Sequence, residues 1–161
     1  MNQRSNYITV EGEQRLRDEL RYLWKTERVE VTQRVSDAAK EGDRSENAEY
    51  IYSKKRLREI DRRIRYLTKR LENIQPISKL PTNKGKVYFG AWVSISNTAN
   101  EQHCYRIVGT DEFDRKQEYI SIDAPMARAL LGKSKGDTIS LSLASGTQNW
   151  TIEEIEYSST D

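Results

Sequence analysis

The chain has 161 residues, of which 35% are hydrophobic and 32% are charged, and its 27 Lys and Arg against 25 Asp and Glu give a net charge of +2. A chain of this length forms one ordinary domain or two small ones and has no room for the buried cavity of a large enzyme. The longest uncharged stretches, 87–100 and 138–152, are too short and too rich in Ser, Thr and Asn to cross a bilayer, so no membrane span is expected.

The N-terminus and the cysteine content indicate a compartment. Residues 1–7 lack the apolar core of a secretory signal. Cys104 is the only cysteine in the sequence, so no intramolecular disulfide is expected, and a lone cysteine is usually a small core residue. We therefore expect a protein of the reducing cytoplasm.

Glycine and proline are unevenly distributed along the chain. Between Glu13 and Gln75 there is no proline and one glycine, Gly42, whereas residues 76–161 contain all three prolines and six of the eight glycines. This shift in composition predicts an N-terminal helical unit at 1–76, a linker at 77–84 and a globular unit at 85–161.

Apolar residues in the first unit repeat at the spacing of a coiled coil. Steps of three and four residues join Leu57, Ile60, Ile64, Leu67, Leu71 and Ile74. The first half has the same repeat at Leu16, Leu20 and Leu23, and resumes it at Val31, Val35 and Ala38 after a slip at 24–28. Such a slip predicts a local unwinding of the coil.

Gly42 falls where the first helix should end, because a glycine in the left-handed conformation commonly closes a helix. The pattern therefore predicts two long antiparallel helices, 13–41 and 46–75, joined as a coiled-coil hairpin.

The globular unit has the pattern of an α+β domain. Short β-type runs occupy 86–96, 104–108, 118–122, 138–143 and 150–157. A short helix is predicted at 125–131, with Pro125 in its first turn and Gly132 after it. Trp92 and Trp150 are expected in the core of this domain.

Basic side chains are concentrated on the second predicted helix. Between Lys54 and Arg70 there are nine Lys and Arg but only two acids, Glu59 and Asp61. Such a row suits the phosphates of a nucleic acid. The alternative is the solvated outer face of a coiled coil. No base-reading surface with interleaved aromatic residues accompanies the row, so sequence-specific recognition is not predicted.

The predicted hairpin tip has the opposite charge. Four acids surround the single Arg44: Glu41, Asp43, Glu46 and Glu49. The spacing of Asp43 and Glu46 also matches a capping box, in which the two side chains close a helix start. Alternatively, the two carboxylates could bind Mg²⁺, which takes one or two protein carboxylates and would need further ligands from a partner.

Three segments resemble the GreA/GreB family of bacterial transcript cleavage factors, and its GreB members most of all. They are GDRSENAEY at 42–50, KKRLREIDRR at 54–63 and YISIDAPMARALL at 119–131. The resemblance implies a coiled-coil hairpin followed by an FKBP-like antiparallel β-sheet domain with a short helix. It also implies a cytoplasmic elongation factor that inserts its hairpin into the secondary channel of RNA polymerase and stimulates the polymerase's own cleavage of backtracked RNA.

The resemblance assigns roles at the tip. Asp43 and Glu46 match the family's tip acids, which would hold Mg²⁺ jointly with the polymerase, so that none is bound by the isolated protein. Asn47 and Tyr50 would support the tip, although Tyr50 could equally be the first core layer of the seam. The hydrolysis itself would belong to the polymerase, and this chain would not be an enzyme.

The resemblance also assigns the contacts with RNA and polymerase. The residues matched to binding of the nascent RNA 3′ end are Lys54, Lys55, Arg56 and Arg58, while Arg62, Arg63 and Arg65 could touch the channel walls. Asp123, Ala124 and Pro125 match the loop that docks on the rim of the polymerase β′ subunit. The structural alternative is that Asp123 and Pro125 only start the short helix. No membrane partner is expected, and a monomer is favoured.

Two other functions fit the same sequence. A regulator of the same fold could occupy the channel and inhibit polymerase without stimulating cleavage. A general RNA-binding coiled coil would bind RNA without polymerase and would not depend on Asp123.

Overall fold

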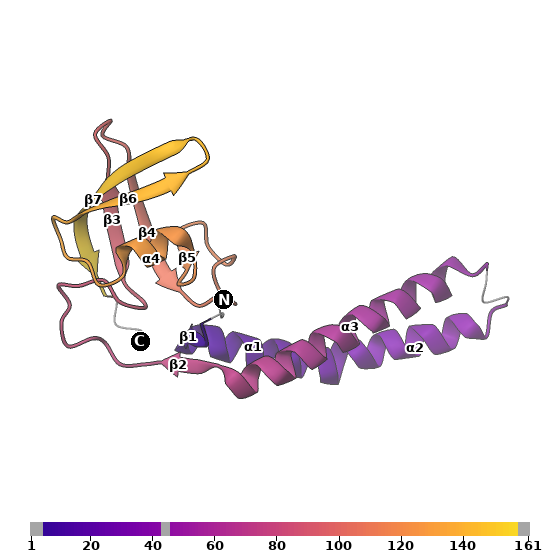
Figure 1. Ribbon diagram of the computed structural model, residues 1–161. Helices are drawn as coiled ribbons and strands as arrows, with labels where there is room; N and C mark the ends of the chain where they lie inside the picture. Colours follow the sequence, from indigo (N-terminus) through magenta and orange to yellow (C-terminus); the bar gives the residue numbers. More distant parts are fainter. Residues whose placement is uncertain (1–4, 43–45, 158–161) are drawn as a thin grey trace. The chain divides into compact units, whose positions relative to one another are not determined.

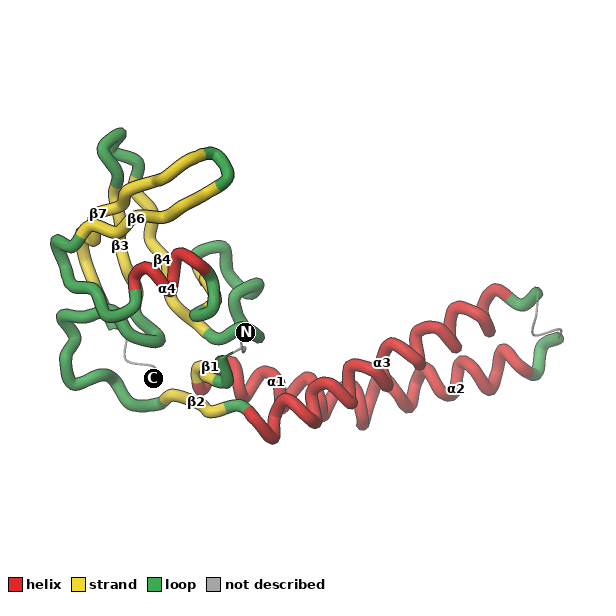
Figure 2. Tube along the Cα trace, viewed as in Figure 1, coloured by secondary structure: helices red, strands yellow, loops and turns green. Residues whose placement is uncertain are grey.

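The computed structural model describes residues 5–42 and 46–157. The chain divides into two compact units, one formed by Glu13–Ile74 and the other by Met1–Gly12 together with Gln75–Asp161. This division differs from the predicted boundaries because the first twelve residues group with the globular unit and not with the hairpin. The α+β class is confirmed, with a helical hairpin in one unit and a mainly antiparallel sheet in the other (Figures 1 and 2).

The hairpin consists of two long helical segments. The first runs through α1 (Val10–Tyr22), a π-helical turn η1 (Leu23–Glu27) and α2 (Arg28–Ala39). The second is the single helix α3 (Ala48–Asn73), which lies along α2 (Figure 1). The expected helices at 13–41 and 46–75 are therefore present with slightly different ends.

The slip in the apolar repeat is explained by η1. The residues buried along the first segment are Leu16, Leu23, Val31 and Ala38, and along α3 they are Ser53, Ile60 and Leu67. Successive positions in α3 are seven residues apart, whereas Leu23 and Val31 are eight apart. A π-helical turn accommodates one extra residue in a helix. The predicted local unwinding is confirmed. Because η1 takes up the extra residue, the buried side chains of α2, Val31 and Ala38, again face α3.

The sheet of the globular unit has the strand order β5-β4-β3-β7-β6. Its strands are β3 (Trp92–Ser96), β4 (Gln102–Val108), β5 (Tyr119–Ser121), β6 (Thr138–Leu143) and β7 (Gly146–Glu156). All neighbours are antiparallel except β4 and β5, which are parallel. Helix α4 (Pro125–Leu130) contacts β5 and β6 and buries Ala127 and Leu130 in the core.

Two expectations about this unit were wrong. Trp150 is buried in the core, but Trp92 is only half-buried, and its ring meets the edge of Tyr119. Cys104 is exposed, because the pleat of β4 directs it away from the core while its partner strand β3 buries Val93 and Ile95.

The N-terminal segment joins the globular unit through a small sheet and a buried carboxylate. Strand β1 (Tyr7–Thr9) pairs in parallel with β2 (Gln75–Ile77), which the sequence analysis missed. Glu112 is 1% exposed and accepts hydrogen bonds from Thr9 N at 3.0 Å, Gly109 N at 2.7 Å and the Thr9 hydroxyl. These bonds explain why residues 5–12 group with the globular unit.

Candidate nucleic-acid interface

Asn47 closes the hairpin at its tip. Helix α2 ends at Ala39, and Gly42 follows with a φ of 148°, a conformation that favours glycine. Asn47 is the N-cap of α3, and its Oδ1 accepts a hydrogen bond from Tyr50 N at 3.1 Å. Its Nδ2 donates to Ala38 O at 2.7 Å. One side chain therefore satisfies a terminal backbone group in each helix and ties the two ends together.

The cap at Asn47 excludes the capping-box interpretation of the tip acids. A capping box would require Asp43 as the N-cap and Glu46 inside the first turn. Glu46 instead precedes the cap, is exposed, and makes no side-chain bond to any residue in 5–42 or 46–157. Asp43 lies outside the described residues. Within the part of the chain that the structure describes, the Glu46 carboxylate is therefore exposed and without a side-chain partner.

Replacing Asn47 with alanine is expected to destabilise the hairpin by about 1 kcal/mol, because the cap of α3 and the bond to Ala38 O are both lost. Asn47→Asp keeps an oxygen for Tyr50 N but loses the donor to Ala38 O. We expect it to retain the helix start and to loosen only the link to α2. Helical circular dichroism during urea unfolding measures the stability. Equal stability of Asn47→Ala and the wild type would contradict this role.

The described residues alone do not form a metal site. No group of three or more His, Cys, Asp or Glu side chains within 5–42 and 46–157 is arranged to hold a metal ion. Exposed carboxylates near the tip include Glu46 and Glu41, and Glu46 directly precedes the cap of α3. A hard-oxygen donor of this kind fits Mg²⁺, which keeps several waters and takes few protein ligands. The donor set fits a shared site, to which a partner brings the other ligands.

Tyr50 is half-buried beside the tip, and the ammonium of Lys54 lies 5.8 Å from the centre of its ring. The first buried layer of α3 is formed by Ser53, one turn further along the helix. Tyr50 therefore covers the end of the seam and also positions a basic residue next to the tip.

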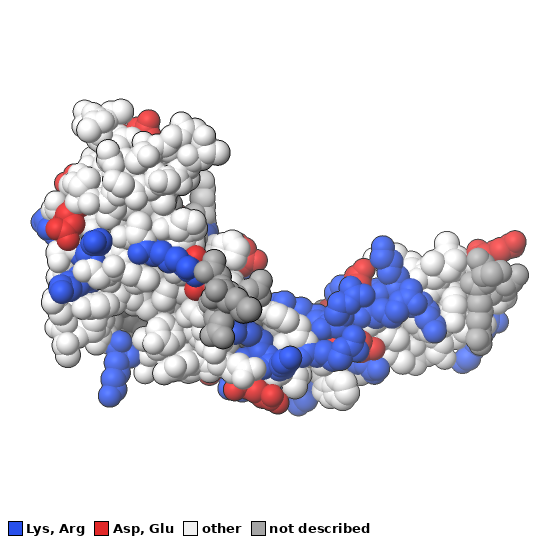
Figure 3. Space-filling view, viewed as in Figure 1, with Lys and Arg blue, Asp and Glu red and all other residues white. Residues whose placement is uncertain are grey.

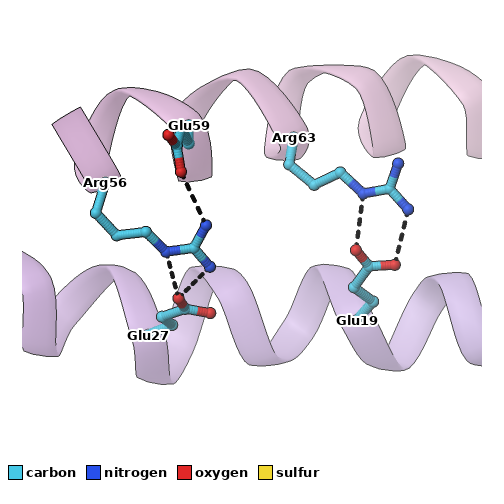
Figure 4. A network of polar contacts seen from close by, with 5 residues as sticks. All are labelled: Glu19, Glu27, Arg56, Glu59 and Arg63. Carbon is cyan, nitrogen blue, oxygen red and sulfur yellow. Dashed lines mark hydrogen bonds and ion pairs between the residues drawn. The ribbon is translucent and has the colours of Figure 1, made fainter.

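Arg56 and Arg63 face the first helical segment and form ion pairs with it (Figure 4). Arg56 Nε donates to Glu27 Oε1 at 2.9 Å, and its Nη1 lies 3.3 Å from Glu59 Oε2. The hydrogen bond with Glu27 raises the pKa of the Arg56 guanidinium above its ordinary value. Arg63 forms a bidentate pair with Glu19, at 2.7 and 3.0 Å. Both arginines therefore hold the hairpin together.

The two acids between Lys54 and Arg70 on α3, Glu59 and Asp61, also form ion pairs. Glu59 accepts from Arg56, and Asp61 accepts from Arg28 Nε at 2.8 Å in a third ion pair between helices. Neither carboxylate is left to neutralise the outward-facing cations.

Five other basic residues form an exposed line along α3, which we call the outer basic row. They are spaced three and four residues apart, at Lys55, Arg58, Arg62, Arg65 and Lys69. This spacing places them on one face of the helix, opposite the seam. None of them pairs with a carboxylate among the described residues. Figure 3 shows Lys and Arg gathered along the middle of the hairpin on the face in view.

The structure thus separates the four residues matched to RNA binding. Lys55 and Arg58 belong to the outer basic row, Lys54 lies over Tyr50, and Arg56 is engaged by Glu27. The sequence analysis did not make this distinction. The signal was present, because Arg56 and Arg63 are seven residues apart at a position that flanks the seam, where interhelical ion pairs form.

The loop at Asp123–Pro125 is held by its own polar contacts. Asp123 Oδ2 accepts hydrogen bonds from Ser5 N and from the Thr110 hydroxyl, both at 2.9 Å. The N-cap of α4 is Ala124, without a side-chain bond, and Pro125 is exposed at the helix start. Pro125 therefore starts the helix as the structural alternative expected, whereas Asp123 fixes the loop and does not cap the helix.

The structure thus combines a two-helix hairpin, which carries an exposed carboxylate near its tip and the outer basic row, with a small α+β domain. The family model described as "Transcription elongation factor, N-terminal" matches residues 6–75, and "Transcription elongation factor, GreA/GreB, C-term" matches residues 82–157. The chain belongs to the GreA/GreB family of transcription elongation factors.

The sequence similarity to known elongation factors extends over nearly the whole chain. It is 58% identical to the transcription elongation factor GreB of Pasteurella multocida over 154 residues, which cover 96% of this chain and 98% of that protein. The corresponding factor of Yersinia pestis is 56% identical over 154 residues, 96% of this chain and 90% of that protein. The solved structure of GreA factor homolog 1 of Thermus thermophilus is 24% identical, with a TM-score of 0.42, over 95% of this chain and 99% of that one.

Within residues 5–42 and 46–157, no helix is both long and apolar enough to cross a bilayer.

Proposed function

We propose that this protein inserts its hairpin into the secondary channel of bacterial RNA polymerase and stimulates cleavage of backtracked nascent RNA. The observation that carries the proposal is the exposed Glu46 carboxylate, which precedes the Asn47 cap and bonds to no side chain among the described residues. Family membership supports the coarser function, that of a transcript cleavage factor acting on RNA polymerase.

At the tip, Asp43 and Glu46 would share Mg²⁺ with acidic residues of the polymerase. The chemistry that Mg²⁺ would supply at such a phosphodiester centre is activation of the attacking water and stabilisation of the leaving oxygen. The Glu46 carboxylate would also accept a hydrogen bond from that water and orient it. Asn47 would restrict the position of Glu46 through its bonds to Ala38 O and Tyr50 N. The reacting groups remain those of the polymerase, so this protein acts as a stimulating factor and not as an enzyme.

The outer basic row would hold the extruded 3′ segment of the RNA. Its members pair with no carboxylate in residues 5–42 and 46–157, so each can neutralise a phosphate without breaking an ion pair seen there. Lys54 would extend this surface toward the tip, whereas Arg56 would contribute mainly to hairpin rigidity.

The globular unit would dock on the rim of the polymerase β′ subunit through Asp123–Pro125. The bonds from Ser5 N and Thr110 hold Asp123, and Pro125 presents an exposed ring next to it. We propose a cytoplasmic monomer, since the hairpin forms its own seam within one chain.

A backtracked elongation complex with 3′-labelled RNA and Mg²⁺ tests the proposal directly. Adding the wild-type protein should release short 3′ fragments rapidly and restore elongation. If the protein binds the complex but leaves the RNA intact and slows nucleotide addition, it is a channel inhibitor and the proposal fails. If it binds free RNA equally well and ignores the polymerase, it is a general RNA-binding coiled coil.

Removing charge from the outer basic row is expected to weaken RNA retention without unfolding the hairpin. Arg58→Ala with Arg62→Ala should lower cleavage several-fold at limiting protein, with a reduced dependence on salt because fewer counterions are released. Arg56→Ala should instead lower hairpin stability by about 1 kcal/mol through loss of its ion pair. The opposite result would refute this division of roles. In that case Arg56→Ala would change the salt dependence of cleavage, and the Arg58→Ala, Arg62→Ala variant would lower hairpin stability.

A further inference from the structure

A groove opens along the hairpin beside the π-helical turn, away from its tip. Its floor is formed by Leu20 from α1 and by Ile64 and Leu71 from α3, and its volume is about 500 Å³. Trp24 forms one wall and is 57% exposed, whereas Trp150 in the globular core is 5% exposed. An indole so exposed beside aliphatic side chains is a surface suited to burial by a partner.

The Trp24 ring is held in place by neighbouring charges. The guanidinium of Arg28 lies 5.5 Å from the ring centre, and Arg28 Nε in turn donates to Asp61 at 2.8 Å. The ring, which belongs to η1, is therefore restrained by a side chain that is itself held in an interhelical ion pair. A restrained aromatic side chain lowers the entropy cost of binding a partner.

The rim of the groove is positively charged. Arg17, Arg21 and Lys25 line it at intervals of four residues along α1 and η1. Arg17 is paired with Glu13 at 3.3 Å. Arg21 and Lys25 are exposed, and no carboxylate of residues 5–42 or 46–157 pairs with them. The groove thus combines an apolar floor with two unneutralised cations on one edge.

We propose that this groove binds an acidic amphipathic helix of a partner protein. The floor spans residues 64–71 of α3, which is about 10 Å of helix at the usual rise and corresponds to two turns of a bound helix. The bound helix places apolar residues at i, i+3 or i+4, and i+7 on the floor and against Trp24. Its Asp or Glu side chains meet Arg21 and Lys25 at the rim. The aliphatic floor favours a peptide over a nucleic acid.

The test uses the full chain and two synthetic peptides. Both are helical, carry leucine at i, i+3, i+4 and i+7, and differ only in having Glu or Lys at the flanking positions. Calorimetry gives the affinities, and the indole N–H signal of Trp24 in NMR spectra locates the site. The Glu peptide should bind at least tenfold more tightly than the Lys peptide and shift the Trp24 signal.

Matched variants separate the groove from general electrostatics. Arg21→Glu with Lys25→Glu should weaken Glu-peptide binding at least tenfold, with helicity unchanged because both side chains are exposed. Arg58→Glu with Arg62→Glu makes the same charge change on the outer basic row and should alter binding less than twofold. The proposal is overturned if the two double variants have equal effects, if the peptides bind equally or not at all, or if a short RNA shifts Trp24 instead.

Discussion

Glu46→Gln is expected to reduce stimulated RNA cleavage by about 100-fold while polymerase binding stays intact, because the substitution removes a charge at the reacting phosphate and little volume. Glu46 is exposed and bonds no side chain among the described residues, so its loss should not change the fold. Single-turnover release of labelled 3′ fragments from a backtracked complex measures the rate. Competition with labelled wild-type protein measures binding.

Glu41→Gln is the matched control for this experiment. Glu41 is an exposed carboxylate near the end of α2, and its removal changes the net charge of the tip by the same amount. We expect it to retain cleavage within about twofold, since uniform charge effects near a surface are small. Equal losses in both variants would mean that the tip acts through its overall charge, and full activity of Glu46→Gln would remove Glu46 from the mechanism. Additional Mg²⁺ should partly restore Glu46→Gln if the carboxylate helps to hold the ion.

Glu112→Ala is expected to destabilise the globular unit by about 3 kcal/mol, which is the largest stability effect that we predict. Its carboxylate accepts from Thr9 N, Gly109 N and the Thr9 hydroxyl, so the substitution leaves three donors without their partner. Gly12 and Gly109 approach the same side chain so closely that a Cβ on either would collide with it. Urea unfolding followed by the fluorescence of Trp92 and Trp150, in a Trp24→Phe background, measures the loss.

Glu112→Gln and Glu118→Ala refine this test. The glutamine keeps the volume and one oxygen for the amides of Thr9 and Gly109, and its NH₂ group would make the Thr9 hydroxyl an acceptor, so we expect a smaller loss than in Glu112→Ala. Glu118 is exposed, and its side chain makes no bond to a described residue, so Glu118→Ala should change stability by less than about 0.5 kcal/mol. An unfolding midpoint of Glu112→Ala equal to that of the wild type would show that the three hydrogen bonds contribute little.

The local patterns of the sequence predicted much of the fold. The repeat of apolar residues predicted both helices and the slip now seen as η1 (Leu23–Glu27). Alternation and turn residues predicted strands β3 to β7 and helix α4, although β3 begins later, at Trp92, and β7 earlier, at Gly146, than expected. These features could be read directly because helix and strand periodicity is a property of neighbouring residues. The tip segment and the segment around Asp123 are specific enough to indicate the family from the sequence alone.

The tertiary structure decided which polar residues hold the protein together. Arg56 and Arg58 belong to the same basic run, yet Arg56 is paired with Glu27 whereas Arg58 lies on the outer basic row. Their difference depends on which side of α3 faces the first segment. Similarly, Thr9 and Glu112 are 103 residues apart in the chain, and their bond exists only because the folded chain brings β1 beside the β4–β5 connection. Composition and periodicity describe neighbours along the chain, so contacts across such separations are set by packing.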